Sequence, residues 1–242
     1  MSTVPKESVI HLWYAELDWS PERLEQGWRV LTLSEQERAM RFVQVKHRER
    51  YIAASAILRD ILSQYTNIPP AALQFRKGEH GKPYLDHPTD LQFNASHSEG
   101  VALFAITRGR EVGVDVEFMR RGVDERGVVE RFFSPREKAE YLALPPSQQL
   151  SAFYRLWTRK EAYIKMIGKG LSFPLKRFSV GLSSANTNQL LEVDDSRGQA
   201  LKWVVLPISI PVKNYRAAVA LEGLIEAVHY FHWDPKKSRL FS

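Results

Sequence analysis

Three acidic residues and one lysine stand at spacings that could build a site for a divalent cation. Asp115 and Glu117 alternate with valines over residues 112–117, so in a strand their side chains point to one face. Glu161 and Lys165 lie in a later stretch whose apolar residues recur at helical spacing, and there they are i and i+4. Carboxylates from a strand and a helix form the oxygen site that Mg²⁺ prefers, and a lysine beside them suits phosphate.

Each of these pairs also has an ordinary explanation. A Glu/Lys pair one helical turn apart is more often a solvated surface ion pair, and Asp115 with Glu117 would suit a solvated strand face. It is the presence of both segments in one chain that favours a metal site. Next to them, Lys160 is left open between a surface position and a site contact, and Trp157 is expected to pack in the core and place the helix.

Four short motifs follow one another between roughly residues 34 and 180. They are Gly81–Pro83, Phe93–Ser98, Gly113–Glu117 and Trp157–Lys165. Each is weak alone, but together and in this order they resemble the signature of the Sfp-type 4′-phosphopantetheinyl transferases. The resemblance implies an enzyme that moves 4′-phosphopantetheine from coenzyme A to a serine of an acyl or peptidyl carrier protein and releases adenosine 3′,5′-bisphosphate. It also implies Mg²⁺ as cofactor, with Mn²⁺ as a substitute.

The resemblance assigns roles to the acidic residues and the lysine. It implies that Asp115, Glu117 and Glu161 hold the metal ion. Glu161 would also take the proton of the carrier serine, although metal binding lowers the pKa of a carboxyl group and makes it a poorer base. Lys165 would bind phosphate oxygens and stabilise the leaving group. Asp115, Glu161 and Lys165 are therefore the expected catalytic residues.

Coenzyme A is expected to contact a second set of residues, which are polar or basic. The residues that the resemblance implies are Arg38, Arg50, Lys82, Ser96, His97 and Lys165. Among them His97 would contact the 3′-phosphate. Some relatives have lysine where this chain has Glu35, so which arginines hold the 3′-phosphate stays open.

The two halves of the chain repeat one order of elements, namely helix, helix and then strands, at a period of roughly 110 residues. Such a long period predicts two similar α+β lobes rather than a repeat array. We place the lobes at 1–111 and 112–242. The resemblance implies a pseudo-twofold pair with the active site at the interface, the 3′-phosphate side in the first lobe and the metal and docking side in the second. Because both halves are in one chain, a monomer is expected.

Two stretches have the spacing of a helix capping box, a Ser followed three residues later by Glu. They are Ser34–Glu37 and Ser134–Glu137, and each is expected to begin a helix. Residues 183–199 are polar and are expected to form an exposed hairpin or loop.

Composition narrows the class of protein and of partner. The chain of 242 residues has no cysteine, which excludes disulfides and thiolate metal sites. No apolar run approaches the ~20 residues of a membrane span, and the first residues do not form a signal peptide, so a cytoplasmic protein is expected. A net charge of +6 predicts an anionic partner.

The anionic partner has several candidates. The resemblance offers coenzyme A and the acidic helix of a carrier protein, with Lys169, Lys176 and Arg177 as docking residues. A basic nucleic-acid-binding module explains the charge but not the three carboxylates, and no run of five like charges supports it. An Mg²⁺-dependent phosphohydrolase would use the same carboxylates with water as nucleophile. Which carrier is served, and whether acyl-coenzyme A is accepted, cannot be read from the sequence.

Overall fold

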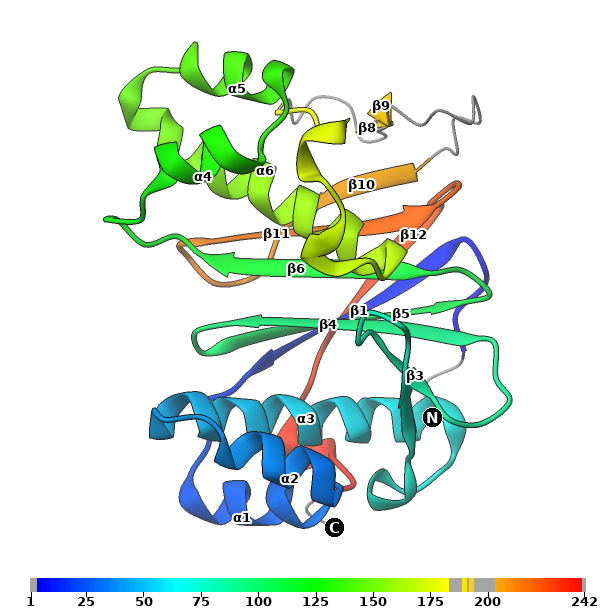
Figure 1. The fold of residues 1–242 in the computed structure, drawn as a ribbon. Coiled ribbons are helices and arrows are strands. Elements are labelled where there is room, and N and C mark those ends of the chain that lie inside the picture. The colour runs from blue at the N-terminus through cyan, green and yellow to red at the C-terminus, as the bar shows by residue number, and fades with distance from the viewer. Residues whose placement is uncertain (1–3, 183–188, 191, 194–202, 241–242) are drawn as a thin grey trace.

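Two four-stranded sheets lie face to face in the middle of the molecule, and helices cover their outer faces (Figure 1). The computed structural model describes residues 4–182, 189–190, 192–193 and 203–240. The strand orders are β12-β1-β5-β4 and β6-β11-β10-β8. The architecture is thus α+β, with two similar lobes of one sheet and its helices each.

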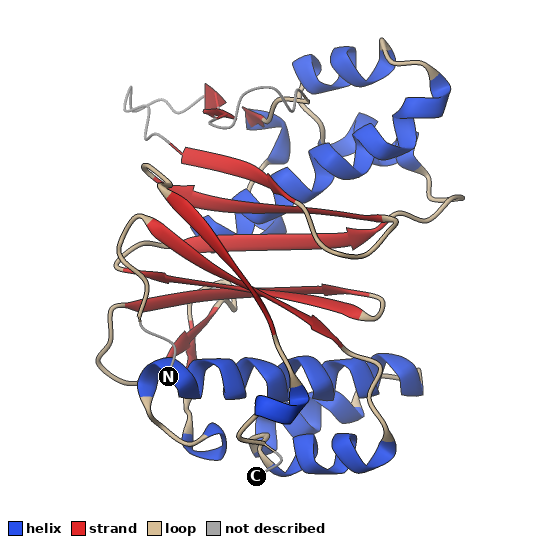
Figure 2. Ribbon diagram, turned by 180° about the vertical axis from the view of Figure 1, so that it is seen from behind, coloured by secondary structure: helices blue, strands red, loops and turns tan. Residues whose placement is uncertain are grey.

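The first lobe carries the earlier elements of the chain and also the last strand. Its elements are β1 (Val9–Glu16), α1 (Pro21–Arg29), α2 (Leu33–Met40), α3 (Val45–Thr66), η1 (Pro70–Ala72), β2 (Phe75–Lys77), β3 (Pro83–Leu85), β4 (Leu91–Ser98), β5 (Val101–Arg108), β12 (Ala227–His232) and η4 (Pro235–Lys237). β12 pairs in parallel with β1, and Figure 2 shows it crossing back from the second lobe. The expected second domain of 112–242 is therefore wrong at its end, because the chain returns to the first lobe from Ala227 on.

The second lobe holds the segment between β5 and β12. Its elements are β6 (Val112–Phe118), α4 (Glu125–Phe132), α5 (Pro135–Leu142), α6 (Pro146–Ile167), η2 (Gly170–Ser172), η3 (Leu175–Arg177), β7 (Phe178–Ser179), β8 (Gln189–Leu190), β9 (Glu192–Val193), β10 (Trp203–Ile208) and β11 (Tyr215–Glu222). Most of residues 183–199, expected to be a loop, lie outside the described residues. Within the described part of the chain, no helix combines the length and the apolar character that a membrane crossing needs.

The alternation of β6 decides which of its side chains enter the core between the sheets. Val112, Val114 and Val116 are buried against apolar residues of the first sheet, such as Leu103 of β5. Because side chains alternate along a strand, Asp115 is turned to the opposite face, where α6 lies. The face that the sequence predicted for the valines is confirmed.

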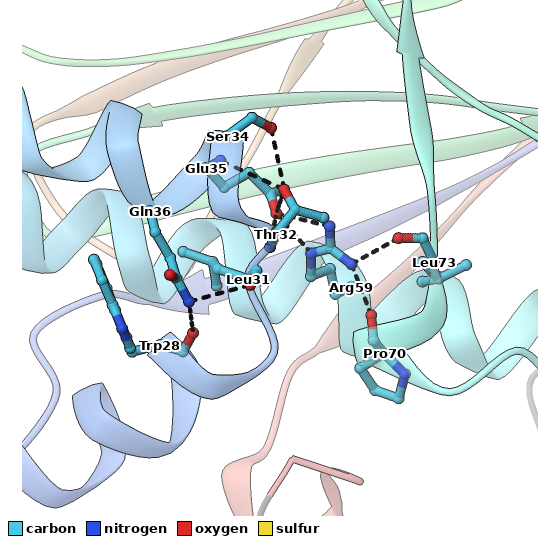
Figure 3. Close-up of polar contacts among 9 residues, drawn as sticks. All are labelled: Trp28, Leu31, Thr32, Ser34, Glu35, Gln36, Arg59, Pro70 and Leu73. Carbon is cyan, nitrogen blue, oxygen red and sulfur yellow. Dashed lines mark hydrogen bonds and ion pairs between the residues drawn. The ribbon is translucent and has the colours of Figure 1, made fainter.

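The helix α2 begins two residues earlier than the expected box at Ser34. Thr32 caps it: the Glu35 amide donates to the Thr32 hydroxyl, and the Thr32 amide donates to Glu35 Oε2 at 2.8 Å. The same Glu35 carboxylate accepts from Arg59, which is fully buried on α3, at 2.7 Å (Figure 3). The expectation at Ser34 was wrong. Thr32 and Glu35 have the same three-residue spacing as Ser34 and Glu37, and it is Thr32 that lies directly before the first residue of the helix.

The helix α5 begins at the expected capping box. Ser134 accepts from the Glu137 amide, and Glu137 Oε2 accepts from the Ser134 amide at 2.8 Å. Glu137 also binds the ammonium of Lys160 on α6 at 2.7 and 2.8 Å, and both side chains are fully buried. The surface position considered for Lys160 is wrong, since this lysine joins α6 to the start of α5.

Candidate active site

Side chains of β4 bind the free edge of β6 and thereby join the two sheets. Alternate amides of β6 donate to alternate side chains of β4. The bonds are Val114 N to Asn94 Oδ1 (2.9 Å), Val116 N to Ser96 Oγ (3.3 Å) and Phe118 N to Ser98 Oγ (3.1 Å). Buried backbone donors need partners, and here side chains of another sheet supply them in place of a neighbouring strand.

The same serines hold the two carboxylates of β6. Ser96 Oγ donates to Asp115 Oδ1 at 2.8 Å, and Ser98 Oγ donates to Glu117 Oε2 at 2.7 Å. From α6, the Lys165 ammonium donates to Asp115 Oδ1 at 2.6 Å and to Ser96 Oγ at 2.8 Å. Residues of β4, β6 and α6 that the sequence singled out separately therefore meet at one point between the lobes.

A glycine on β6 allows α6 to lie this close. A Cβ atom on Gly113 would stand 1.9 Å from Ala162 O and 2.4 Å from Met166 N, both backbone atoms of α6. Any other residue would push the helix away from the strand. Gly113 thus sets the separation between Asp115 and the helix that carries Glu161 and Lys165.

The carboxylates of Asp115, Glu117 and Glu161 are close enough to shift one another's pKa values. Burial and the charge of Asp115 raise the pKa of Glu161 to about 7, with a smaller contribution from Glu117 and an opposing one from Lys165. Burial and the charge of Asp115 also raise the pKa of Glu117. Three negative groups in a poorly solvated place are unfavourable unless a cation joins them.

A carboxylate oxygen that accepts no hydrogen bond from the protein is available to bind a metal ion. Asp115 is buried, and its Oδ2 has no hydrogen-bond partner. As the side chains are placed, the described residues contain no group of three or more His, Cys, Asp or Glu already arranged as a ligand set. The other oxygen of this carboxylate, Asp115 Oδ1, accepts a hydrogen bond from Lys165. The donor set of Asp115, Glu117 and Glu161 is all carboxylate oxygen, which suits Mg²⁺ or Mn²⁺.

A positive region lies beside the carboxylates. His97 is on β4, and its side chain reaches solvent. Desolvation lowers the pKa of His97, and the charges of Lys165, Arg38, Arg50 and His47 lower it further. Several cations directed at one place would bind a phosphate group well.

Arg38 also lines a cavity of about 270 Å³ between α2, α3 and the β2–β3 hairpin. Its guanidinium lies 5.4 Å from the ring centroid of Tyr51, and Lys77 and Pro83 line the opposite side. The cavity joins basic groups with an aromatic ring, which is a suitable lining for a phosphorylated base. Lys77 was not singled out from the sequence.

Arg50, expected to contact coenzyme A, is engaged by two carboxylates. Its Nε donates to Asp18 Oδ1 at 2.9 Å and its Nη1 to Glu99 Oε2 at 2.6 Å. Glu99 also accepts from Arg120 of the second lobe at 2.7 Å. In this structure Arg50 belongs to an ion-pair chain that crosses between the lobes, and its contact with coenzyme A stays a prediction.

Lys82 also crosses between the lobes. Its ammonium donates to Val112 O at 3.1 Å, to Met166 O at 3.0 Å and to Glu111. These contacts use its three donors. Lys82 therefore ties the β2–β3 hairpin to the last turn of α6, and its contact with coenzyme A stays a prediction.

Asn94 and Ser98 were missed as residues of the site. Both lie on β4, which runs from Leu91 to Ser98 and includes Ser96 between them. The alternation of polar residues at Asn94, Ser96 and Ser98 was the available signal, because residues two apart share one strand face.

Comparison with known proteins adds the family. Residues 111–220 match the model of the 4′-phosphopantetheinyl transferase superfamily, and residues 17–108 match that of the 4′-phosphopantetheinyl transferase N-terminal region. The chain is 35% identical over 230 residues to the 4′-phosphopantetheinyl transferase HetI of Nostoc sp., which covers 94% of this chain and 90% of that protein. It is 31% identical to the transferase Sfp of Bacillus subtilis strain 168 over 70% of this chain and 74% of that one. A further Bacillus subtilis 4′-phosphopantetheinyl transferase is 36% identical over 63% of this chain and 66% of its own length.

Proposed function

The chain belongs to the 4′-phosphopantetheinyl transferase superfamily, and from this premise we propose how its side chains divide the work of moving 4′-phosphopantetheine from coenzyme A to a carrier serine. The convergence of Lys165, Asp115 and Ser96 between the lobes is the observation that carries the proposal. These groups come from three elements of both lobes, and the positive region around His97 lies next to them.

Asp115, Glu117 and Glu161 would hold the divalent cation. When bound, the cation supplies positive charge to the phosphate oxygens of coenzyme A. Ser96 and Ser98 orient Asp115 and Glu117 through the hydrogen bonds described above, and this fixes the direction of their remaining oxygens.

Glu161 and Lys165 would act on the reacting groups. The carboxylate of Glu161 is partly buried and its pKa is raised, so it is placed to accept the proton of the carrier serine. The ammonium of Lys165 would donate to the phosphate oxygens and stabilise the bisphosphate as it leaves. Hydrogen bonds to Asp115 and Ser96 hold the Lys165 ammonium between the lobes, where the phosphate groups would bind.

The nucleotide end of coenzyme A would lie in the first lobe. Arg38 and Lys77, which line the cavity described above, would offer positive charge to the 3′-phosphate, and His97 lies close enough to Arg38 to be influenced by its charge. Arg50 would join them by giving up one of its two carboxylate partners.

The carrier protein would dock on the second lobe beyond the end of α6. Lys169, Lys176 and Arg177 are exposed there, on the two short 3-10 turns η2 and η3 and just before them. Reversing Lys176 and Arg177 to Glu should raise the Michaelis constant for the carrier about tenfold or more and leave coenzyme binding unchanged. The matched control reverses Lys236 and Lys237, which are exposed in the first lobe. An equal effect of both pairs would show that net charge alone is responsible.

The decisive experiment is mass spectrometry of apo carrier proteins incubated with the enzyme, coenzyme A and Mg²⁺. A transferase adds the mass of phosphopantetheine to the carrier, whereas a phosphohydrolase changes only coenzyme A. An unmodified carrier with consumed coenzyme A would contradict the proposal. Fatty acid, polyketide and nonribosomal peptide carriers tested side by side would identify the pathway, and light scattering would test the expected monomer.

A further inference from the structure

A second cavity, of about 590 Å³, lies in the second lobe between α6 and the connection from β10 to β11. Four basic residues line it: Arg155 and Arg159 of α6, Lys213 of the connection and Arg216 at the start of β11. Neither the reaction nor the proposed docking surface uses these residues. The described residues that line it include no aspartate or glutamate.

Two arginines of this cavity, Arg155 and Arg216, lie close enough for their charges to repel one another. Arg155 Nε is buried and has no hydrogen-bond partner. Burial and the charge of the neighbouring Arg216 lower the pKa of Arg155. Arg216 is held toward α6 by a hydrogen bond of 2.9 Å from its Nη2 to Ser151 Oγ. Guanidinium groups gathered in this way repel one another unless an anion is bound between them.

The rest of the lining indicates what kind of anion would fit. Ile208 is buried, and Ile210 and Val212 are partly buried; all three border the same cavity. Thr158 and Tyr215 add hydroxyl groups. A volume of this size holds a small organic molecule rather than a bare ion, and planar guanidinium groups bind phosphate in a bidentate manner.

We propose that this cavity is a binding site for an organic phosphate, with Arg155 and Arg216 on the phosphate and the apolar wall on the organic part. It is separate from the coenzyme site, which the proposed function places in the first lobe and between the lobes. Arg216 stands directly opposite Glu117 in the β6–β11 pair. Directly paired residues of neighbouring strands share one face of the sheet, so Arg216 and Glu117 both lie on the face that α6 covers.

The test measures binding of phenyl phosphate to the full chain by calorimetry, in the presence of saturating coenzyme A and Mg²⁺. We expect one further molecule to bind the wild type, and Arg155→Gln to weaken this binding at least about tenfold. Inorganic phosphate should bind more weakly than phenyl phosphate, because it leaves the apolar wall unused. Arg131→Gln, which removes an exposed arginine of the same lobe outside the cavity, should bind like the wild type.

A second readout separates a ligand site from a structural arginine. Without ligand, Arg155→Gln should melt at or above the temperature of the wild type, because it removes a desolvated charge beside Arg216. A lower melting temperature with unchanged phenyl phosphate binding would overturn the proposal. So would equal weakening in Arg131→Gln, equal binding of inorganic phosphate, or loss of the further site when coenzyme A is added. If Arg155→Gln does not fold, Lys213→Gln tests the same site at an exposed position, with an expected loss of about threefold.

These results do not depend on the transfer assay. Carrier modification with no phenyl phosphate binding would leave the proposed function in place and remove only the second site. Phenyl phosphate binding with no carrier modification would support the second site and contradict the proposed function.

Discussion

The two lobes contain the same buried ion pair in the same place and differ in the residue that follows it. In the first lobe Glu35 at the start of α2 binds Arg59 of α3, and in the second Glu137 at the start of α5 binds Lys160 of α6. In both, the glutamate closes a capping box, so a single carboxylate holds the start of one helix to the middle of the next. The pair therefore belongs to the scaffold that the lobes share.

The next residue on each long helix is a carboxylate with a different fate. Asp60 is fully buried and accepts from Trp233 Nε1 at 2.7 Å and from the Arg239 amide at 2.9 Å. Glu161, at the equivalent position, has Asp115 as its strongest charged neighbour, followed by Lys165 and Glu117. In the first lobe, Asp60 thus binds the segment around Trp233 and Arg239. In the second lobe, the equivalent Glu161 is the residue proposed to bind a ligand.

The strand that packs against the long helix also differs between the lobes: it is β1 against α3 in the first lobe and β6 against α6 in the second. In the first lobe His11 and Trp13 of β1 both hydrogen-bond to the Tyr65 hydroxyl of α3, and bulky rings fill the space. In the second lobe Gly113 brings α6 close to β6, and Asp115 lies between them. At this contact between strand and helix, the second lobe has a glycine and a buried carboxylate where the first lobe has bulky rings.

The largest effect on transfer is expected from the two carboxylates of the second lobe that lie at the contact between β6 and α6. Glu161→Gln and Asp115→Asn should each lower transfer by about 10²–10⁴-fold, as expected for loss of a ligand or a base, while the melting temperature stays within a few degrees. Purified variants would be assayed for carrier modification and by calorimetric unfolding. A fully active Asp115→Asn enzyme would remove the metal assignment.

Asp60→Ala should behave in the opposite way. It leaves the buried Trp233 indole and the Arg239 amide without an acceptor, at a cost of roughly 3 kcal/mol. Transfer per folded molecule should change less than about threefold. If this variant lost transfer without losing stability, the division of roles between the two lobes would be wrong.

The ion pairs themselves should differ in strength. Lys160→Met leaves Glu137 fully buried and charged, and it should lower the free energy of unfolding by about 3–5 kcal/mol. Arg59→Met should cost less, about 2–3 kcal/mol, since the Glu35 side chain is 19% exposed and keeps some solvent. Urea unfolding of both variants measures the difference. Replacing both members, Glu137 and Lys160, by Met should recover part of the loss; no recovery would mean that the charge is not the cause.

Gly113→Ala should affect both stability and activity. Its Cβ collides with backbone atoms of α6, so the helix must move outward, at a cost of about 1–3 kcal/mol. Transfer should fall about tenfold or more because Lys165 moves away from Asp115. Val114→Ala on the opposite face of the strand is the control, with similar destabilisation and nearly normal transfer. Equal transfer in both variants would show that this spacing does not matter.

The smallest effect is a pH dependence that belongs to the first lobe. Burial and the neighbouring His229 lower the pKa of His11 from 6.5 to about 4, so below pH 6.5 the unfolded chain binds a proton that the folded chain does not. Stability should therefore fall as the pH drops from 6.5 toward 4, by about 1 kcal/mol between pH 7.5 and 5.5. Unfolding curves of the wild type and His11→Gln at both pH values measure it. The same slope in both proteins would assign the loss to other groups.

How much the sequence could predict depends on whether the information is local. Alternation in β6 and helical spacing in α6 placed Asp115 and Lys165 on defined faces, and the structure brings them together. The ion pair of Lys160 could not be predicted, because its partner Glu137 is 23 residues away and the meeting depends on how two helices pack. The same holds for Asn94, whose bond to β6 joins two different sheets.

The long separation between Asp60 and its partners has a consequence for how the molecule is made. On the ribosome, Asp60 emerges far ahead of Trp233 and Arg239, and β1 emerges far ahead of β12. The first lobe therefore cannot complete its core or its sheet until translation has reached the last residues of β12 and beyond. A chain truncated before β12 would carry an open β1 edge and would lack the two donors that Asp60 binds, so its first sheet could pair with other chains.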